Sequence, residues 1–209
     1  MTHIIWLPIF LILGGSISLF SAGNKHLDRK KDRITLLPVG NIQKWVLESL
    51  TGALERTFGC PVETDEKVKL PAEAFNQRRN QYSSSKILEE IHSFVKPESQ
   101  EKVLAIADVD LYVSGLNFVF GEAELGGHLA LISLCRLRQS FYGRPENKTL
   151  FMERAVKEAV HELGHVYGLA HCPDTECVMH FSNSLMDTDR KSSSFCSRCR
   201  QELQKLSSQ

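Results

Sequence analysis

The chain has 209 residues, 42% of them hydrophobic, and its 25 basic and 25 acidic side chains give a formal net charge of zero. This length is enough for one domain of about 170 residues after a leader segment. The balanced charge argues against a nucleic-acid partner, and the sequence shows no internal repeat.

An apolar, uncharged stretch at residues 4–22 precedes a basic segment at residues 25–33. The length of this stretch lies between that of a signal-peptide core and that of a full membrane span, and Ser21-Ala22-Gly23 offers a small-residue cleavage site. No Lys or Arg precedes the stretch, and the basic residues after it favour a flank that stays in the cytoplasm. We therefore expect a membrane anchor with a cytoplasmic domain, and export after signal-peptide cleavage is the alternative.

Strand and helix patterns alternate along residues 34–137, which predicts an α/β fold with a partly parallel, mixed sheet. The apolar spacing predicts, in chain order, a strand at 34–40, a helix at 42–58, a short strand at 60–68, an irregular surface connection at 70–85, a helix at 86–95, and strands at 103–107, 116–121 and 128–137. A helix is expected next at 149–168. Everything after Cys172 is expected to be loop-rich, with one short helix near 197–206.

The helix expected at 149–168 carries the zinc-hydrolase signature H-E-x-x-H-x-x-G-x-x-H. His161 and His165 are one helical turn apart, so both imidazoles can hold one ion. Glu162 stands beside the first histidine, where a carboxylate can act as general base. Gly168 lets the chain turn sharply and return His171 as a third ligand. Three protein ligands leave one zinc position open, as in catalytic sites; two core histidines and a loop histidine are the purely structural alternative.

A cluster of four cysteines follows directly on this motif. Cys172 and Cys177 form one close pair, and Cys196 and Cys199 form a second. Two close pairs separated by a loop are typical of a closed, tetrahedral structural zinc site. Two disulfides are the alternative, which would suit an exported chain. The C-terminal part holds little apolar material, so a metal would supply folding free energy that a core cannot.

These two motifs resemble those of the archaemetzincins, a group of metzincin zinc peptidases that interlace a four-cysteine site with the long histidine motif. The resemblance covers residues 158–199 and extends more weakly through residues 111–137. Carried over by position, it implies a catalytic zinc held by His161, His165 and His171, a general base at Glu162, and a structural zinc held by Cys172, Cys177, Cys196 and Cys199. It also implies a methionine turn at Met179, with Met186 as the rival.

The fold that this resemblance implies is metzincin-like: a mixed twisted sheet with packed helices, an active-site helix and a small, loop-rich, zinc-stapled C-terminal subdomain. We expect a hydrophobic segment at residues 1–23, a basic linker at 24–33, a catalytic subdomain at 34–170 and the C-terminal subdomain at 171–209.

The chemistry expected is that of a zinc-dependent metallopeptidase with two zinc ions per chain, in which Glu162 assists the attack of a zinc-bound water on a peptide bond. Metzincin-like folds hold the substrate along an edge strand, for which residues 116–125 are the candidate. His180 and Asn183 are candidates for holding the oxyanion. We expect a monomer acting on peptides or polypeptides. A non-catalytic zinc protein that binds peptides and a zinc hydrolase of non-peptide amides are the alternatives.

Overall fold

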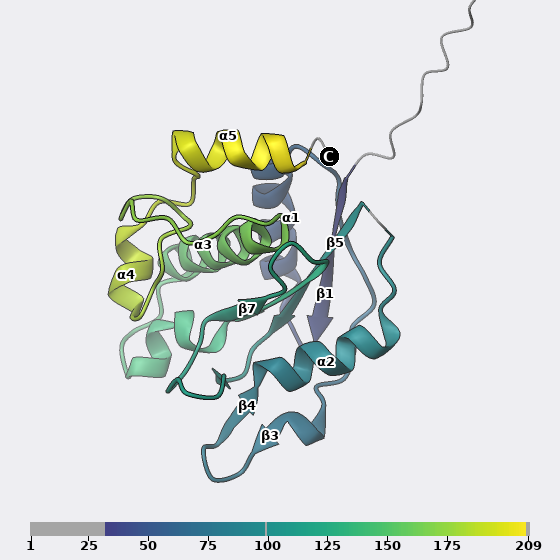
Figure 1. The fold of residues 1–209 in the computed structure, drawn as a ribbon. Coiled ribbons are helices and arrows are strands. Elements are labelled where there is room, and N and C mark those ends of the chain that lie inside the picture. Colours follow the sequence, from purple (N-terminus) through teal and green to yellow (C-terminus); the bar gives the residue numbers. More distant parts are fainter. Residues whose placement is uncertain (1–31, 99, 208–209) are drawn as a thin grey trace, which may run out of the picture.

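The computed structural model describes residues 32–98 and 100–207. They form a mixed α/β fold in which helices pack on a twisted sheet (Figure 1), and the predicted fold class is confirmed. Within these ranges, every helix is too short or too polar to cross a membrane. The predicted anchor or signal segment at residues 4–22 lies outside the described residues.

The main sheet has five strands in the order β2-β1-β5-β8-β7. Their bounds are Arg33–Val39 for β1, Val62–Thr64 for β2, Glu101–Ala107 for β5, Gly121–Ala123 for β7 and Leu129–Ser133 for β8. The first four strands of this order run parallel, and β7 pairs antiparallel with β8 at one edge. The crossover connections between parallel strands place helices on both faces.

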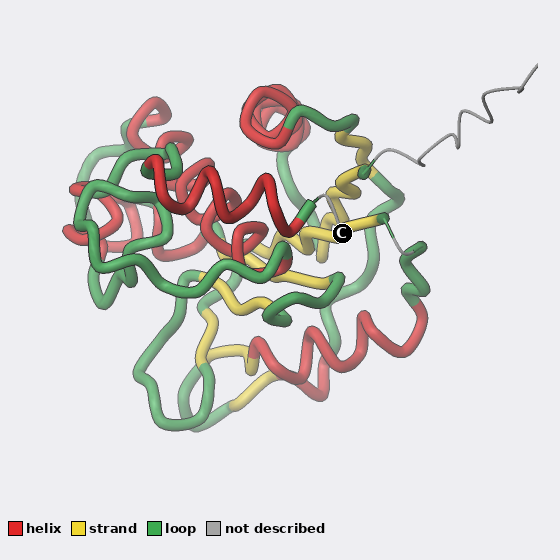
Figure 2. The backbone as a smooth tube through the Cα atoms, turned by 45° about the horizontal axis from the view of Figure 1, so that its top comes forward, coloured by secondary structure: helices red, strands yellow, loops and turns green. Residues whose placement is uncertain are grey.

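Two helices cover one face of this sheet and a third covers the other (Figures 1 and 2). α1 (Lys44–Phe58) and α3 (Lys148–Val166) pack on the face that includes Leu104 and Ile106 of β5. α2 (Ser84–Phe94) packs on the opposite face, against Val103 and Ala105. Alternate residues of the buried strands therefore enter two separate hydrophobic cores, which explains their continuous apolar runs.

Three parts of the secondary structure differ from the sequence-based predictions. The connection at 70–85 is ordered rather than irregular: it contains a 3₁₀ turn (Ala72–Ala74), β3 (Phe75–Asn76) and β4 (Gln81–Ser83), and β4 also pairs with β6 (Leu111–Tyr112). The strand predicted at 116–121 is wrong, because the ladder with β8 begins only at Gly121. A helix that was not predicted, α4 (Leu185–Arg190), precedes the expected α5 (Ser197–Leu206).

The remaining elements are the 3₁₀ helices Cys135–Leu137 and Gln139–Tyr142, which lead from β8 to α3. Asn147 caps α3: its side-chain oxygen accepts a hydrogen bond from the Leu150 N–H at 3.0 Å. The segment after α3 folds back over this helix, so α4 lies beside it (Figure 1). The four cysteines of this segment belong to, or pack against, the same hydrophobic core as α3. α3 is therefore packed between the sheet and the C-terminal segment.

Candidate active site

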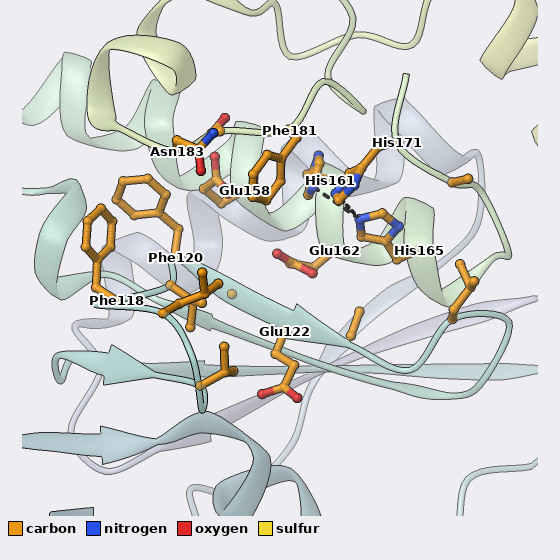
Figure 3. A pocket seen from close by; sticks show the side chains of 18 of the residues that line it. Phe118, Phe120, Glu122, Glu158, His161, Glu162, His165, His171, Phe181 and Asn183 are labelled. Atoms are coloured by element: carbon orange, nitrogen blue, oxygen red, sulfur yellow. Dashed lines mark hydrogen bonds between the residues drawn. The ribbon is translucent and has the colours of Figure 1, made fainter. Parts of the chain in front are cut away.

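Three histidines converge at the C-terminal end of α3. His161 and His165 lie one turn apart on the helix, and Gly168, with φ of +97°, reverses the chain and brings His171 back. The Nε2 atom of His165 lies 3.2 Å from Nε2 of His161 and 3.2 Å from Nε2 of His171 (Figure 3). The structure thus brings together the three histidines that the sequence motif singled out.

Backbone carbonyls fix the tautomers of the two helical histidines. Nδ1 of His161 lies 2.8 Å from the Val178 oxygen, and Nδ1 of His165 lies 2.7 Å from the Leu169 oxygen. A carbonyl oxygen can only accept, so each Nδ1 carries the proton and each Nε2 presents a lone pair. Burial, followed by the nearby Lys191 charge, holds the pKa of His161 well below its usual range, which keeps the ring neutral.

This arrangement fits a zinc ion. Nitrogen ligands about 2.05 Å from a tetrahedral ion lie about 3.3 Å apart, which agrees with the 3.2 Å separations of the Nε2 atoms. The Nε2 lone pairs of His161 and His165, which converge at this distance, repel one another unless a cation lies between them. The donor set of three neutral imidazoles also leaves one tetrahedral position to a non-protein ligand.

Glu162 lies on α3 next to His161 and lines the same cleft (Figure 3). Its carboxyl group is buried between α3 and the edge strand β7, directly against Gly121. Burial, and then the neighbouring Glu158 carboxyl, raise the pKa of Glu162 well above its usual range, while Lys191 acts in the opposite direction. A carboxylate with a raised pKa is a stronger base than one in water.

Met179 is fully buried against α3. A methyl group on Gly164 would overlap the Met179 sulfur, so the absence of a side chain at Gly164 lets the thioether pack on the helix at this position. Met186, the rival for the methionine turn, is 72% exposed. The structure therefore places Met179, and not Met186, in contact with α3 beside the histidine motif.

The four cysteine sulfurs form a second cluster, within 4.8 Å of one another. Cys172 Sγ and Cys196 Sγ are 3.8 Å apart, close to the separation of about 3.8 Å expected for sulfurs 2.3 Å from a tetrahedral zinc. None of these four cysteines is joined in a disulfide. The backbone N–H of Cys199 is the main cause that lowers the pKa of Cys196 to about 7, which favours the thiolate form of that side chain, whereas burial raises the pKa of Cys177 and of Cys199.

The cleft in front of the histidines has a volume of about 680 Å³. Its wall includes the chain from 116 to 123, so apolar side chains that were predicted to belong to a strand line the cleft instead. Of the two candidates for holding an oxyanion, Asn183 lines the cleft. The ring of His180 is held 3.0 Å from the Cys172 oxygen through Nδ1 and is not among the lining residues.

A buried charged network behind the site was not predicted from the sequence. Glu158 lies one turn before His161 and Glu162 on α3 and lines the cleft. Its Oε1 atom accepts a hydrogen bond from the Thr188 hydroxyl at 3.1 Å and lies 3.1 Å from Nζ of the fully buried Lys191. The helical spacing of Glu158 from Glu162 was a usable signal, but nothing in the sequence pairs it with Lys191.

The chain is similar to known proteins over nearly all of its described length. Residues 31–205 match the model of peptidase family M54. An archaemetzincin of Methanocaldococcus jannaschii is 45% identical over 172 residues, which cover 82% of this chain and 93% of that protein. An archaemetzincin of Pyrococcus furiosus is 43% identical over 179 residues, which cover 83% and 93%.

Solved structures show the same likeness. The archaemetzincin of Methanopyrus kandleri superposes with a TM-score of 0.77 at 36% identity, covering 88% of this chain and 99% of that one. The archaemetzincin of Archaeoglobus fulgidus, solved in complex with malonate, superposes with a TM-score of 0.71 at 39% identity, covering 81% and 99%. Sequence and structure comparisons therefore point to the same family.

Proposed function

Because the chain belongs to peptidase family M54 and is a zinc metallopeptidase, we propose that it hydrolyses peptide bonds with Glu162 as the general base. The catalytic zinc ligands in this proposal are His161, His165 and His171, whose Nε2 atoms converge. A zinc ion held by three histidines lowers the pKa of a bound water to about 7 and polarises a carbonyl group.

Glu162 moves the proton in this reaction. Its carboxylate accepts a proton from the attacking water while the water oxygen bonds to the carbonyl carbon of the substrate. The same carboxyl group then gives this proton to the amine nitrogen as the carbon–nitrogen bond breaks. Its burial beside His161 supports this role, because a raised pKa makes the carboxylate a better proton acceptor.

The edge strand β7 offers main-chain groups to the substrate. Backbone hydrogen bonds from Ser133 N–H to the Phe120 oxygen and from Glu124 N–H to the Leu129 oxygen show which residues face β8. In an antiparallel pair these positions alternate, so the N–H and C=O groups of Gly121 and Ala123 point away from β8. An extended peptide can add to this edge as a further strand next to Glu162.

We also propose that the chain holds two zinc ions, the second bound by the four cysteines. The 3.8 Å separation of Cys172 Sγ and Cys196 Sγ supports metal rather than a disulfide at that pair.

For the N-terminal segment we propose, from the sequence alone, a membrane anchor at residues 4–22 with a cytoplasmic catalytic domain. N-terminal sequencing of the native protein tests it, since a mature chain that begins near Asn24 would contradict the anchor.

The strongest support for the proposed function is that three converging imidazoles and a buried carboxyl group line the same cleft. The test is cleavage of a peptide library by the wild type and by the Glu162→Ala variant, both with bound zinc. We expect the variant to lose about 10²- to 10⁴-fold in rate, the usual contribution of a general base. Unchanged cleavage would refute the proposal, and turnover of small amides without peptide cleavage would favour the non-peptide alternative.

A further inference from the structure

Gly121 lies where the edge strand meets the carboxyl group of Glu162. A methyl group on Gly121 would lie 2.6 Å from Glu162 Oε1, 2.7 Å from its Cγ and 2.8 Å from its Cδ. Real Cβ atoms do not approach other heavy atoms so closely. Gly121 is also not among the glycines with positive φ, so any L-residue can adopt its backbone conformation. Space, rather than backbone conformation, is what requires glycine at this position.

The strand that carries Gly121 is fixed on its other side. The neighbouring residue Glu122 points away from the histidines (Figure 3) and accepts hydrogen bonds from the hydroxyls of Ser84, at 2.5 Å, and Ser85, at 2.9 Å, at the start of α2. The ladder with β8 fixes the register, pairing Gly121 with Ile132. A side chain at position 121 would therefore displace the carboxyl group of Glu162 more readily than it would displace β7.

We propose that Gly121 is a positioning residue for the general base: its missing side chain leaves the space that holds the Glu162 carboxyl group beside the strand edge that receives the substrate. This inference rests on the proposed role of Glu162. The main-chain N–H and C=O groups of Gly121 face the open edge of the sheet, and a side chain at this position would point toward Glu162. One residue therefore sets the distance between the backbone of the bound peptide and the carboxylate that moves its protons.

The Gly121→Ala variant tests this role. We expect kcat to fall about 100-fold, because a displacement of about 1 Å of a catalytic group has an effect of that size. KM and zinc content should stay within about twofold of the wild type, since the added methyl group faces neither the open strand edge nor the histidines. The matched control is Gly52→Ala in α1, where a methyl group would meet only the Arg56 guanidinium, at 3.3 Å; its kcat should equal that of the wild type.

Pairing each glycine variant with Glu162→Ala separates positioning from a general effect on the strand. Gly121→Ala should lower Tm by several degrees in the wild type, since relieving such a contact strains the packing. The same substitution should leave Tm unchanged when Glu162→Ala has already removed the contact. A Tm loss that persists with Glu162→Ala, or a Gly121→Ala enzyme with wild-type kcat while Glu162→Ala is inactive, would overturn the inference. An active Glu162→Ala enzyme would instead refute the proposed function.

Discussion

At the scale of single residues, the site is set by which atom of each side chain faces the cleft. The sequence predicted the three histidines because their spacing alone places them on one helix face and one turn beyond it. It gave no sign of the carbonyls of Val178 and Leu169 that fix the ring tautomers, because those contacts depend on how the chain returns after α3. The spatial role of Gly121 was equally hidden, since a glycine in a strand has several possible causes.

His171 allows the contribution of one proposed zinc ligand to be tested. Its side chain is the most exposed of the three histidines, so His171→Ala should leave the packing of the fold intact. The affinity for zinc at the three-histidine site should fall by more than about 100-fold, because the loss of a direct ligand has a larger effect than the loss of a contact that supports a ligand. Zinc titration and thermal unfolding measured together check this prediction.

The control for that substitution is His92→Ala. The His92 side chain is 67% exposed and lies beside Glu124, outside the group of histidines that could hold a metal. The His92→Ala substitution should change neither the affinity for zinc nor Tm. If His171→Ala kept wild-type zinc affinity, the chain would bind its catalytic metal without the third imidazole.

At the scale of elements, the helices were predictable and the short pieces were not. α3 was expected at 149–168 and spans Lys148–Val166, because a long amphipathic helix has a strong period. α4 has only six residues and was missed, although Ser184 and Asp187 form a capping box at its start. The strand predicted at 116–121 failed for another reason: its apolar side chains line the cleft rather than a sheet face.

The buried pair of Glu158 and Lys191 connects α3 to the segment after α4. The Lys191 side chain is 0% exposed and that of Glu158 is 3% exposed. The contact is an ion pair rather than a well-oriented hydrogen bond. Lys191→Met should therefore lower the free energy of unfolding by about 3–5 kcal/mol, because it leaves a buried carboxylate without its cation. Urea denaturation of the single variants and of Lys191→Met combined with Glu158→Gln measures the coupling.

The double variant should lose much less than the sum of the two single losses, since neither buried charge is then left alone. The exposed pair of Lys44 and Glu48, 3.2 Å apart on α1, is the matched control. Its coupling should stay at or below about 0.5 kcal/mol. Additive losses at Glu158 and Lys191 would show that the buried pair does not join these two segments.

The capping box of α4 should make the thermal stability of the fold depend on pH. Hydrogen bonds from the Ser184 hydroxyl, and then from the backbone N–H groups of Ser184 and Asn183, hold the pKa of Asp187 below its usual value. A carboxyl group with a lowered folded pKa stabilises the fold above its unfolded pKa of about 3.9, and this stabilisation is lost as pH falls through the folded pKa. Asp187→Asn should therefore lower Tm at pH 6 and make little difference at pH 2. An equal Tm difference at both pH values would contradict the role of the charge.

At the scale of the whole molecule, the fold brings together an edge strand, a helix and a returning C-terminal segment that are distant in the sequence. β7 places Gly121 against Glu162, and the residues after α3 supply His171, Met179 and the buried Lys191. The mixed α/β class and the clustering of the three histidines and of the four cysteines were predictable, because motif spacing and strand–helix alternation are local properties. Contacts between distant segments depend on the three-dimensional path of the chain. The residue spacing in a single sequence does not reveal that path.

The most direct measurement is an anomalous-scattering map at the zinc absorption edge, from crystals of the chain purified without a chelator. We expect two peaks per chain. One should lie about 2.0–2.1 Å from the Nε2 atoms of His161, His165 and His171, and the other about 2.3 Å from the four cysteine sulfurs. A map without a peak among those three imidazoles, in protein that still cleaves peptides, would show that the peptidase activity does not depend on a zinc ion at this site.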